Sequence, residues 1–161
     1  MAKGPAMPPA DKEETVLQLL RDAPGHRNEL ITGLNQRELN AWSWHWPVWA
    51  RPSQLAPRGD WRTWLILAGR GYGKTRAGAE WVRSVAEAAP DARIALVAAN
   101  LAEGRAIMVD GESGLLAIAP PQRLPRFEAS LRRLTWPNGA QATLFSAHEP
   151  ESLRGPQHSH A

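Results

Sequence analysis

An α/β fold with a parallel strand–helix–strand core is predicted by three consecutive stretches of this sequence. Two are short apolar runs, residues 63–68 and 93–99, that lack the alternation of a half-exposed strand. Such runs are typical of strands buried on both faces of a sheet. Residues 75–88, between them, place apolar side chains at helical spacing. The order predicts a right-handed βαβ unit with parallel strands.

Before this core, the sequence predicts a disordered arm and a helical segment. Residues 1–10 contain three prolines and a glycine without periodicity, and we expect them to be disordered. Residues 11–50 are expected to be helical, with one helix starting at the N-cap Asp11 and a second over about 28–42. The tryptophan-rich stretch that begins at Trp42 is predicted to be a loop or a broken helix.

After the core, the sequence predicts short helices and a β-hairpin. Residues 101–118 resemble one or two short helices broken at Gly111, and residues 120–126 form a proline-rich loop. The pair Asn138–Gly139 lies between two alternating segments, which is a strong hairpin signal. We therefore expect strands at about 132–136 and 141–145.

Composition limits the classes of function. With 161 residues, of which 43% are apolar and 22% charged, the chain has the composition of a globular domain. Lys and Arg number 19 against 16 Asp and Glu, an excess that permits nucleic-acid contact without requiring it. The absence of cysteine excludes disulfides and thiolate chemistry and favours the cytoplasm. Every uninterrupted apolar run is far shorter than the ~20 residues that span a bilayer, so no membrane contact is expected.

The sequence AGRGYGKT, residues 68–75, predicts a phosphate-binding P-loop. It matches GxxxxGK[ST] at Gly73, Lys74 and Thr75, with Ala68 in place of the first glycine and Gly69 one residue late. In this motif backbone N–H groups surround an anion, the lysine reaches the β and γ phosphates, and the hydroxyl ligates Mg²⁺. The alternative is a glycine-rich turn without a ligand. The strand and helix expected around it favour an incomplete P-loop NTPase domain over residues 51–161, with ATP and Mg²⁺ as cofactors. Its expected phosphate-binding residues are Gly69, Arg70, Gly71, Tyr72, Gly73, Lys74 and Thr75.

Five separated segments in order, LILAGRGYGKTRAGAEWV, RIALVAA, GESGLLAI, WPNGAQATLFSA and PESLRGPQ, resemble the large terminase subunits of tailed phages and gene transfer agents. The resemblance covers about residues 42–161. It implies the ATPase part of a motor that packages double-stranded DNA into procapsids. The implied partners are DNA, a terminase small subunit, the portal of the procapsid and further copies in a ring, in the cytoplasm of a bacterial host.

The resemblance also assigns roles to three further residues. Gln54 is similar to a glutamine that contacts adenine, although a solvated loop amide is the alternative. Arg70 is similar to a P-loop arginine that touches the γ-phosphate; the alternative is that it only pairs with a nearby carboxylate. Arg154 is similar to a catalytic arginine finger that reaches the nucleotide of a neighbouring subunit; the alternative is an arginine that only stabilises its turn.

Several features favour a structural interpretation or remain open. We expect the four tryptophans between residues 42 and 49 to cover a small core rather than stack on bases. We expect His158 and His160 to face solvent, and we assign no metal cluster. No apolar strand ending in Asp-Glu follows the P-loop, so binding of ATP without turnover is expected of this chain. A helicase-like NTPase, a small kinase and a non-catalytic adaptor stay as alternatives.

Overall fold

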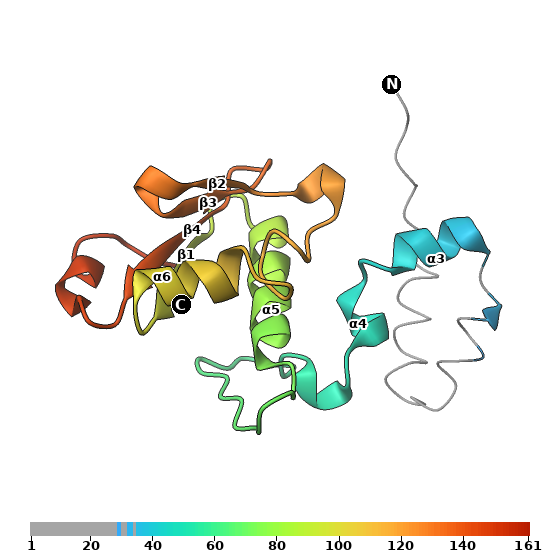
Figure 1. Ribbon diagram of the computed structural model, residues 1–161. Helices are drawn as coiled ribbons and strands as arrows, with labels where there is room; N and C mark the ends of the chain where they lie inside the picture. Colours follow the sequence, from blue (N-terminus) through green and yellow to red (C-terminus); the bar gives the residue numbers. More distant parts are fainter. Residues whose placement is uncertain (1–28, 30–31, 34) are drawn as a thin grey trace. The chain divides into compact units, whose positions relative to one another are not determined.

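The computed structural model describes residues 29, 32–33 and 35–161 (Figure 1). The described chain divides into two compact units between residues 64 and 65. Each unit is described by itself. The predicted arm over residues 1–10 and the helix from Asp11 lie outside the described residues.

The first unit contains short helices. They are α3 (Gln36–Trp42), α4 (Trp46–Trp49) and the 3₁₀ turn η2 (Pro52–Gln54). The indole Nε1 of Trp49 donates to the carbonyl oxygen of Trp42 at 2.8 Å, and Trp42 is buried whereas Trp49 is partly exposed. The tryptophan-rich stretch is therefore a broken helix, which is one of the two forms that the sequence predicted. Its buried Trp42 belongs to a small core, as expected.

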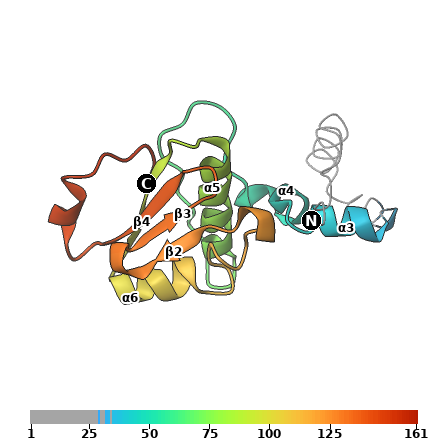
Figure 2. The ribbon, with the colours of Figure 1, turned by 90° about the horizontal axis from the view of Figure 1, so that it is seen from above.

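The second unit is built on a mixed four-stranded sheet in the order β1-β4-β3-β2 (Figure 2). Strands β1 and β4 are parallel, and the β4–β3 and β3–β2 pairs are antiparallel. The strands are β1 (Arg93–Ala98), β2 (Arg126–Glu128), β3 (Arg133–Thr135) and β4 (Gln141–Ser146). The fold is α/β, as predicted, although the sheet is mixed.

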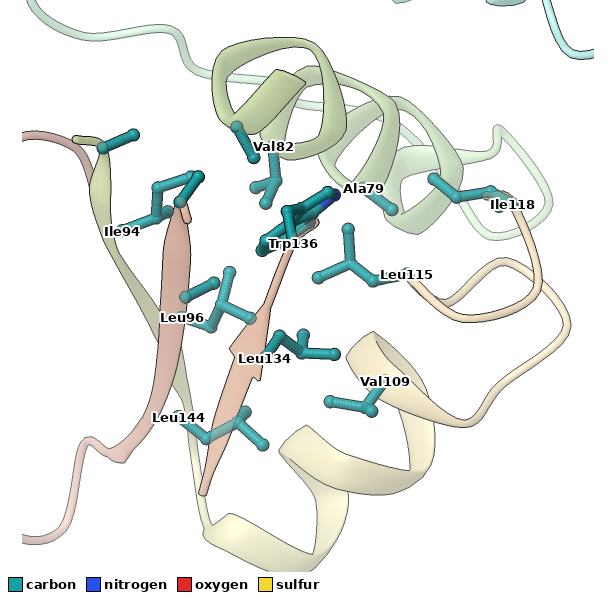
Figure 3. Close-up of a cluster of buried hydrophobic side chains, with 14 residues drawn as sticks. Ala79, Val82, Ile94, Leu96, Val109, Leu115, Ile118, Leu134, Trp136 and Leu144 are labelled. Carbon is teal, nitrogen blue, oxygen red and sulfur yellow. The ribbon is translucent and has the colours of Figure 1, made fainter. Parts of the chain in front are cut away.

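Helices pack on one face of this sheet. The longest is α5 (Lys74–Ala88); the short α6 (Leu101–Gly104) begins after Asn100, whose Oδ1 accepts from the Glu103 amide at 2.9 Å. A π-helical turn, η3 (Arg105–Val109), continues α6, and 3₁₀ turns η4 (Pro121–Arg123), η5 (Ala129–Leu131) and η6 (Pro150–Leu153) follow. The buried core lies between these helices and the sheet (Figure 3); it includes Ala79, Val82, Ile94, Leu96, Val109, Leu115, Ile118, Leu134, Trp136 and Leu144.

Three predicted elements are confirmed. The expected helix over 75–88 is α5, the expected strand over 93–99 is β1, and the expected hairpin is β3–β4. The side-chain amide of Asn138 in the hairpin turn donates to the carbonyl oxygen of Ala86 at 2.8 Å. The turn thus satisfies a carbonyl in the last turn of α5, which couples the hairpin to the helix. The short helix expected near 101–118 is also present and ends before Gly111.

The prediction of a strand over residues 63–68 is wrong. In the part of the chain that the structure describes, this segment has no strand pairing, and Leu65 and Leu67 are 72% and 86% exposed. An apolar run becomes a buried strand only if neighbouring strands supply backbone partners, and none lies beside this one. The parallel partner of β1 is instead β4. Strand β2 was not predicted, because it is three residues long and follows a loop rich in proline.

The C-terminal tail pairs with the other edge of β1. The Ser159 amide donates to the Arg93 carbonyl at 2.8 Å, and the Ala95 amide donates to the His160 carbonyl at 2.9 Å. The imidazole of His158 packs edge-on against Phe145, and that of His160 packs against Trp81. The prediction that both histidines face solvent is therefore wrong, since each is half-buried in a ring contact.

Candidate functional site

The glycine-rich loop of residues 68–75 leads directly into helix α5. Gly71 has φ 80° and Gly73 has φ 88° and ψ 30°, both in the left-handed region that only glycine adopts without strain. Tyr72 between them does not have positive φ. Alternation of left-handed and ordinary backbone turns successive N–H groups toward a common point, which is the geometry of an anion nest. The structure thus explains why the loop has glycine at these two positions.

The replacement of the first motif glycine by Ala68 is compatible with this geometry. Among the described residues, the one non-glycine with positive φ is Arg132. Ala68 therefore has a backbone conformation that an L-residue adopts without strain.

The N-terminus of α5 adds positive potential to the loop. Gly73 is its N-cap, no side chain caps the free N–H groups, and no acidic residue lies in the first turn. A helix N-terminus carries roughly half a positive elementary charge, and its unpaired N–H groups favour a bound anion. The ammonium group of Lys74 lies in this first turn and adds a full charge.

The side chain of Lys74 folds back over the loop. Its Nζ donates to the carbonyl oxygens of Ala68 and Gly69, both at 2.8 Å. These two bonds hold the ammonium group against the loop that precedes α5. The hydroxyl-bearing Thr75 is the next residue of the helix and is exposed. The structure therefore holds the lysine ammonium group against the glycine-rich loop, with Thr75 exposed in the first turn of α5.

A buried ion-pair cluster on α5 was not predicted. The side chain of Glu80 is 1% exposed, with Arg76 Nη2 at 2.7 Å from one carboxylate oxygen and Arg83 Nη2 at 2.8 Å from the other. Burial raises the pKa of Glu80 above its usual value, against the opposing effect of the two guanidinium groups. The i, i+4 and i, i+3 spacing of Arg76, Glu80 and Arg83 is the sequence signal that could have revealed it.

This cluster also connects α5 to the loop after η3. Arg83 Nη1 lies 3.4 Å from the carbonyl oxygen of Ile118, and Arg123 Nη1 lies 2.6 Å from the carboxylate of Glu87. Both contacts join positions far apart in the sequence. They fix the helix that carries Lys74 against the rest of its own unit.

Arg70 is exposed at the turn of the loop. Within the described chain no carboxylate pairs with it and no hydrogen bond reaches it. The alternative interpretation, pairing with a nearby carboxylate, has no partner among the described residues and stays untested for the rest of the chain. Its guanidinium group stays accessible to a ligand in the loop.

Gln54 and Arg154 occupy different environments. Gln54 lies in the first unit and is 6% exposed, and its Oε1 accepts from the Arg51 amide at 3.0 Å. The alternative of a solvated loop amide is wrong for this residue. Arg154 is exposed after η6, where its Nη1 lies 2.7 Å from the Glu151 carboxylate. An exposed pair of this kind contributes at most about 1 kcal/mol, so it holds the arginine only weakly.

Two observations concern metals and membranes. The described residues contain no group of three or more His, Cys, Asp or Glu side chains placed to hold a metal ion. None of the helices in that part of the chain combines the length and apolar character needed to span a membrane.

Comparison with protein families matches residues 65–161 to the terminase large subunit, T4-like virus type, N-terminal part. Comparisons with curated proteins and with solved structures give no match. The family match covers more than half of the chain and includes the glycine-rich loop, α5 and all four strands. On this evidence the chain belongs to the T4-like-virus type of the terminase large subunit family, in the N-terminal part of that subunit.

Proposed function

We propose that the loop of residues 68–75 binds the phosphates of ATP, and that the chain is the ATP-binding portion of a terminase large subunit that powers the packaging of double-stranded DNA. The family implies a role in DNA packaging. The observation that supports a nucleotide site is the joint position of two left-handed glycines, an uncapped helix N-terminus and the folded-back ammonium group of Lys74. Together they support the proposal that residues 68–75 act as a phosphate-binding P-loop.

Each residue has a defined role in this proposal. Lys74 exchanges its two backbone carbonyl partners for β- and γ-phosphate oxygens. The Thr75 hydroxyl would hold Mg²⁺, which neutralises phosphate charge when it is bound. The exposed Arg70 contacts the γ-phosphate. Gln54 contacts the adenine edge, and Arg154 serves as an arginine finger toward nucleotide.

The proposed assembly follows from the family. In it, the chain acts in the cytoplasm of a phage-infected bacterium or of one that makes gene transfer agents. A terminase small subunit supplies DNA, the portal of the procapsid receives it, and further copies of the chain form a ring. Nucleotide binding can be measured on this chain without its partners, and it is therefore the step that the following experiment tests.

Titration of the full chain with ATP and Mg²⁺, followed by calorimetry, tests the proposal. Replacement of Lys74 by alanine removes a charge-assisted contact to phosphate, and we expect affinity to fall by about tenfold or more. Thr75→Val should reduce the gain in affinity that Mg²⁺ provides and leave metal-free binding less affected.

Arg62→Ala is the control, because Arg62 is exposed and its replacement removes the same charge outside the loop. It should bind as the unmodified chain does. Equal affinities for the unmodified chain and Lys74→Ala would reject the site. A folded chain that binds no nucleotide would favour a non-catalytic adaptor.

A further inference from the structure

The face of the sheet opposite the helices carries polar side chains in two rows. Cross-strand pairing places Arg126 beside Thr135 and Thr135 beside Gln141, which forms the first row. The second row joins Glu128, Arg133 and Thr143. Because side chains alternate between faces, the residues between them, such as Leu134, point into the core. Figure 2 shows the three strands side by side.

A hollow of about 370 Å³ lies on this polar face. This volume is at the lower end of the usual range for small-ligand sites. Five members of the two rows line it, together with residues that flank the strands; the full lining is Leu124, Arg126, Glu128, Arg133, Thr135, Trp136, Pro137 and Gln141. The hollow is separate from the glycine-rich loop, since no residue of 68–75 lines it.

Three residues that line the hollow have a buried polar atom for which the described part of the chain offers no hydrogen-bond partner; the atoms are Arg133 Nε, Thr135 Oγ1 and Trp136 Nε1. Trp136 is part of the core, whereas Arg133 and Thr135 belong to the polar rows. An unsatisfied buried polar group costs about 1–3 kcal/mol, so such atoms are rare in folded proteins. The side chains of Arg133 and Thr135 lie two positions apart on the same face of β3. They therefore point to a ligand that supplies acceptor atoms.

The chemistry of the hollow selects an anion. The guanidinium groups of Arg126 and Arg133 only donate hydrogen bonds, and the Thr135 hydroxyl and the Gln141 amide can also donate. Glu128 lies 3.3 Å from Arg133 Nη2 and 3.7 Å from Arg126 Nη2, so it cancels one of the two positive charges and leaves a net charge of one. Several donors around one positive charge match the multiple acceptor oxygens of a phosphate group.

We propose that this hollow on β2, β3 and β4 binds a phosphate group, with Arg133 and Thr135 as its principal donors. The phosphate can come from free phosphate or from the backbone of duplex DNA, which the packaging role supplies. The inference does not depend on nucleotide binding at Lys74.

Backbone amide NMR of the full chain tests the proposal, with inorganic phosphate and a short duplex DNA as separate probes. We expect amides of residues 133–141 to shift with phosphate. A shift of the same amides by the duplex assigns the phosphate to DNA, whereas no shift by the duplex assigns the hollow to free phosphate. If only amides of residues 70–75 respond to phosphate, the hollow is not a site, although the P-loop still binds.

Substitutions at the hollow give a second readout. Thr135→Val keeps the size and β-branching of the side chain but removes a donor, so we expect phosphate affinity to fall about tenfold. Thr143→Val is the matched control, because Thr143 lies on the same face outside the hollow. It should bind normally.

The sign of the effect at Glu128 is decisive. Glu128→Gln removes a negative charge from the hollow, and we expect phosphate to bind several times more tightly. Weaker binding by this variant, or equal binding by Thr135→Val and Thr143→Val, would overturn the proposal.

Discussion

Arg132 is a residue under backbone strain. It has φ 54° and ψ 33°, is exposed, and lies where the 3₁₀ turn η5 passes into β3. A left-handed conformation costs a non-glycine residue roughly 1–2 kcal/mol. The Leu144 amide donates to its carbonyl at 2.8 Å, so the strain is maintained by the β3–β4 pairing.

Arg132→Gly should stabilise the chain. Glycine adopts this backbone without the steric cost, although it loses more conformational freedom on folding, so we expect a net gain of up to about 1 kcal/mol. Urea unfolding measures it. Arg126→Gly, at an extended position of β2, serves as the contrast and should lower stability. A loss of stability in Arg132→Gly would show that the arginine side chain stabilises the folded chain by more than its left-handed backbone conformation destabilises it.

Residue-level features divide into those that sequence can and cannot reveal. Gly71 and Gly73 were predicted as loop residues from the sequence motif, and the structure gives both of them positive φ. The contacts of Lys74 were not predicted, because the position of a long flexible side chain depends on which acceptors are nearest in space. The burial of Gln54 was missed for a similar reason, since its neighbours Arg51 and Pro52 are typical of a solvated loop.

At the scale of elements, the sequence predicted those helices and strands whose signal is local, and failed where an element depends on distant partners. Helix α5 and the β3–β4 hairpin were predicted because periodicity and an Asn-Gly turn lie within the segments themselves. The segment 63–68 has an equally clear apolar pattern, yet a strand exists only through its partners. The parallel pairing of β1 with β4 joins positions about fifty residues apart along the chain, and no local signal encodes it.

The ion-pair cluster on α5 predicts a pH dependence of stability. Burial raises the pKa of Glu80 above 4.5, so the folded chain holds this proton more tightly than the unfolded chain does. The contribution to stability is fully present below pH 4.5 and is lost as pH rises through the raised pKa. Glu80→Gln cannot titrate, so the free energy of unfolding of the unmodified chain should fall with rising pH relative to that of the variant.

Urea unfolding over a series of pH values measures this difference. Glu112→Gln, which alters an exposed carboxylate, should run parallel to the unmodified chain. If the free energy of unfolding of the unmodified chain instead rises with pH relative to that of Glu80→Gln, attraction by Arg76 and Arg83 outweighs the effect of burial on the pKa of Glu80.

At the scale of the whole chain, the tail closes one edge of the sheet in its unit. The backbone bonds of Ser159 and His160 to β1 cover part of a strand edge, and exposed edges are a known aggregation risk. The ring contacts to Phe145 and Trp81 hold the tail in place.

Ser159→Pro should detach the tail. Proline has no N–H to donate to the Arg93 carbonyl, so we expect a loss of about 1–2 kcal/mol and faster hydrogen exchange at the Ala95 amide, which donates to His160. Ser159→Ala removes the hydroxyl but keeps this N–H, and should leave Ala95 protected. Unchanged exchange of Ala95 in Ser159→Pro would mean that the tail does not need this bond.

The two carbonyl bonds of Lys74 have a consequence for kinetics. The ammonium group is already coordinated, so the oxygens of Ala68 and Gly69 act as placeholders for an incoming anion. An anion that binds the loop through Lys74 must therefore replace these two carbonyl oxygens as hydrogen-bond acceptors of the ammonium group. The enthalpy of binding is then smaller than the new contacts alone would give, because the two old hydrogen bonds are lost. Dissociation of the anion is faster for the same reason, since Lys74 regains these bonds when the anion leaves.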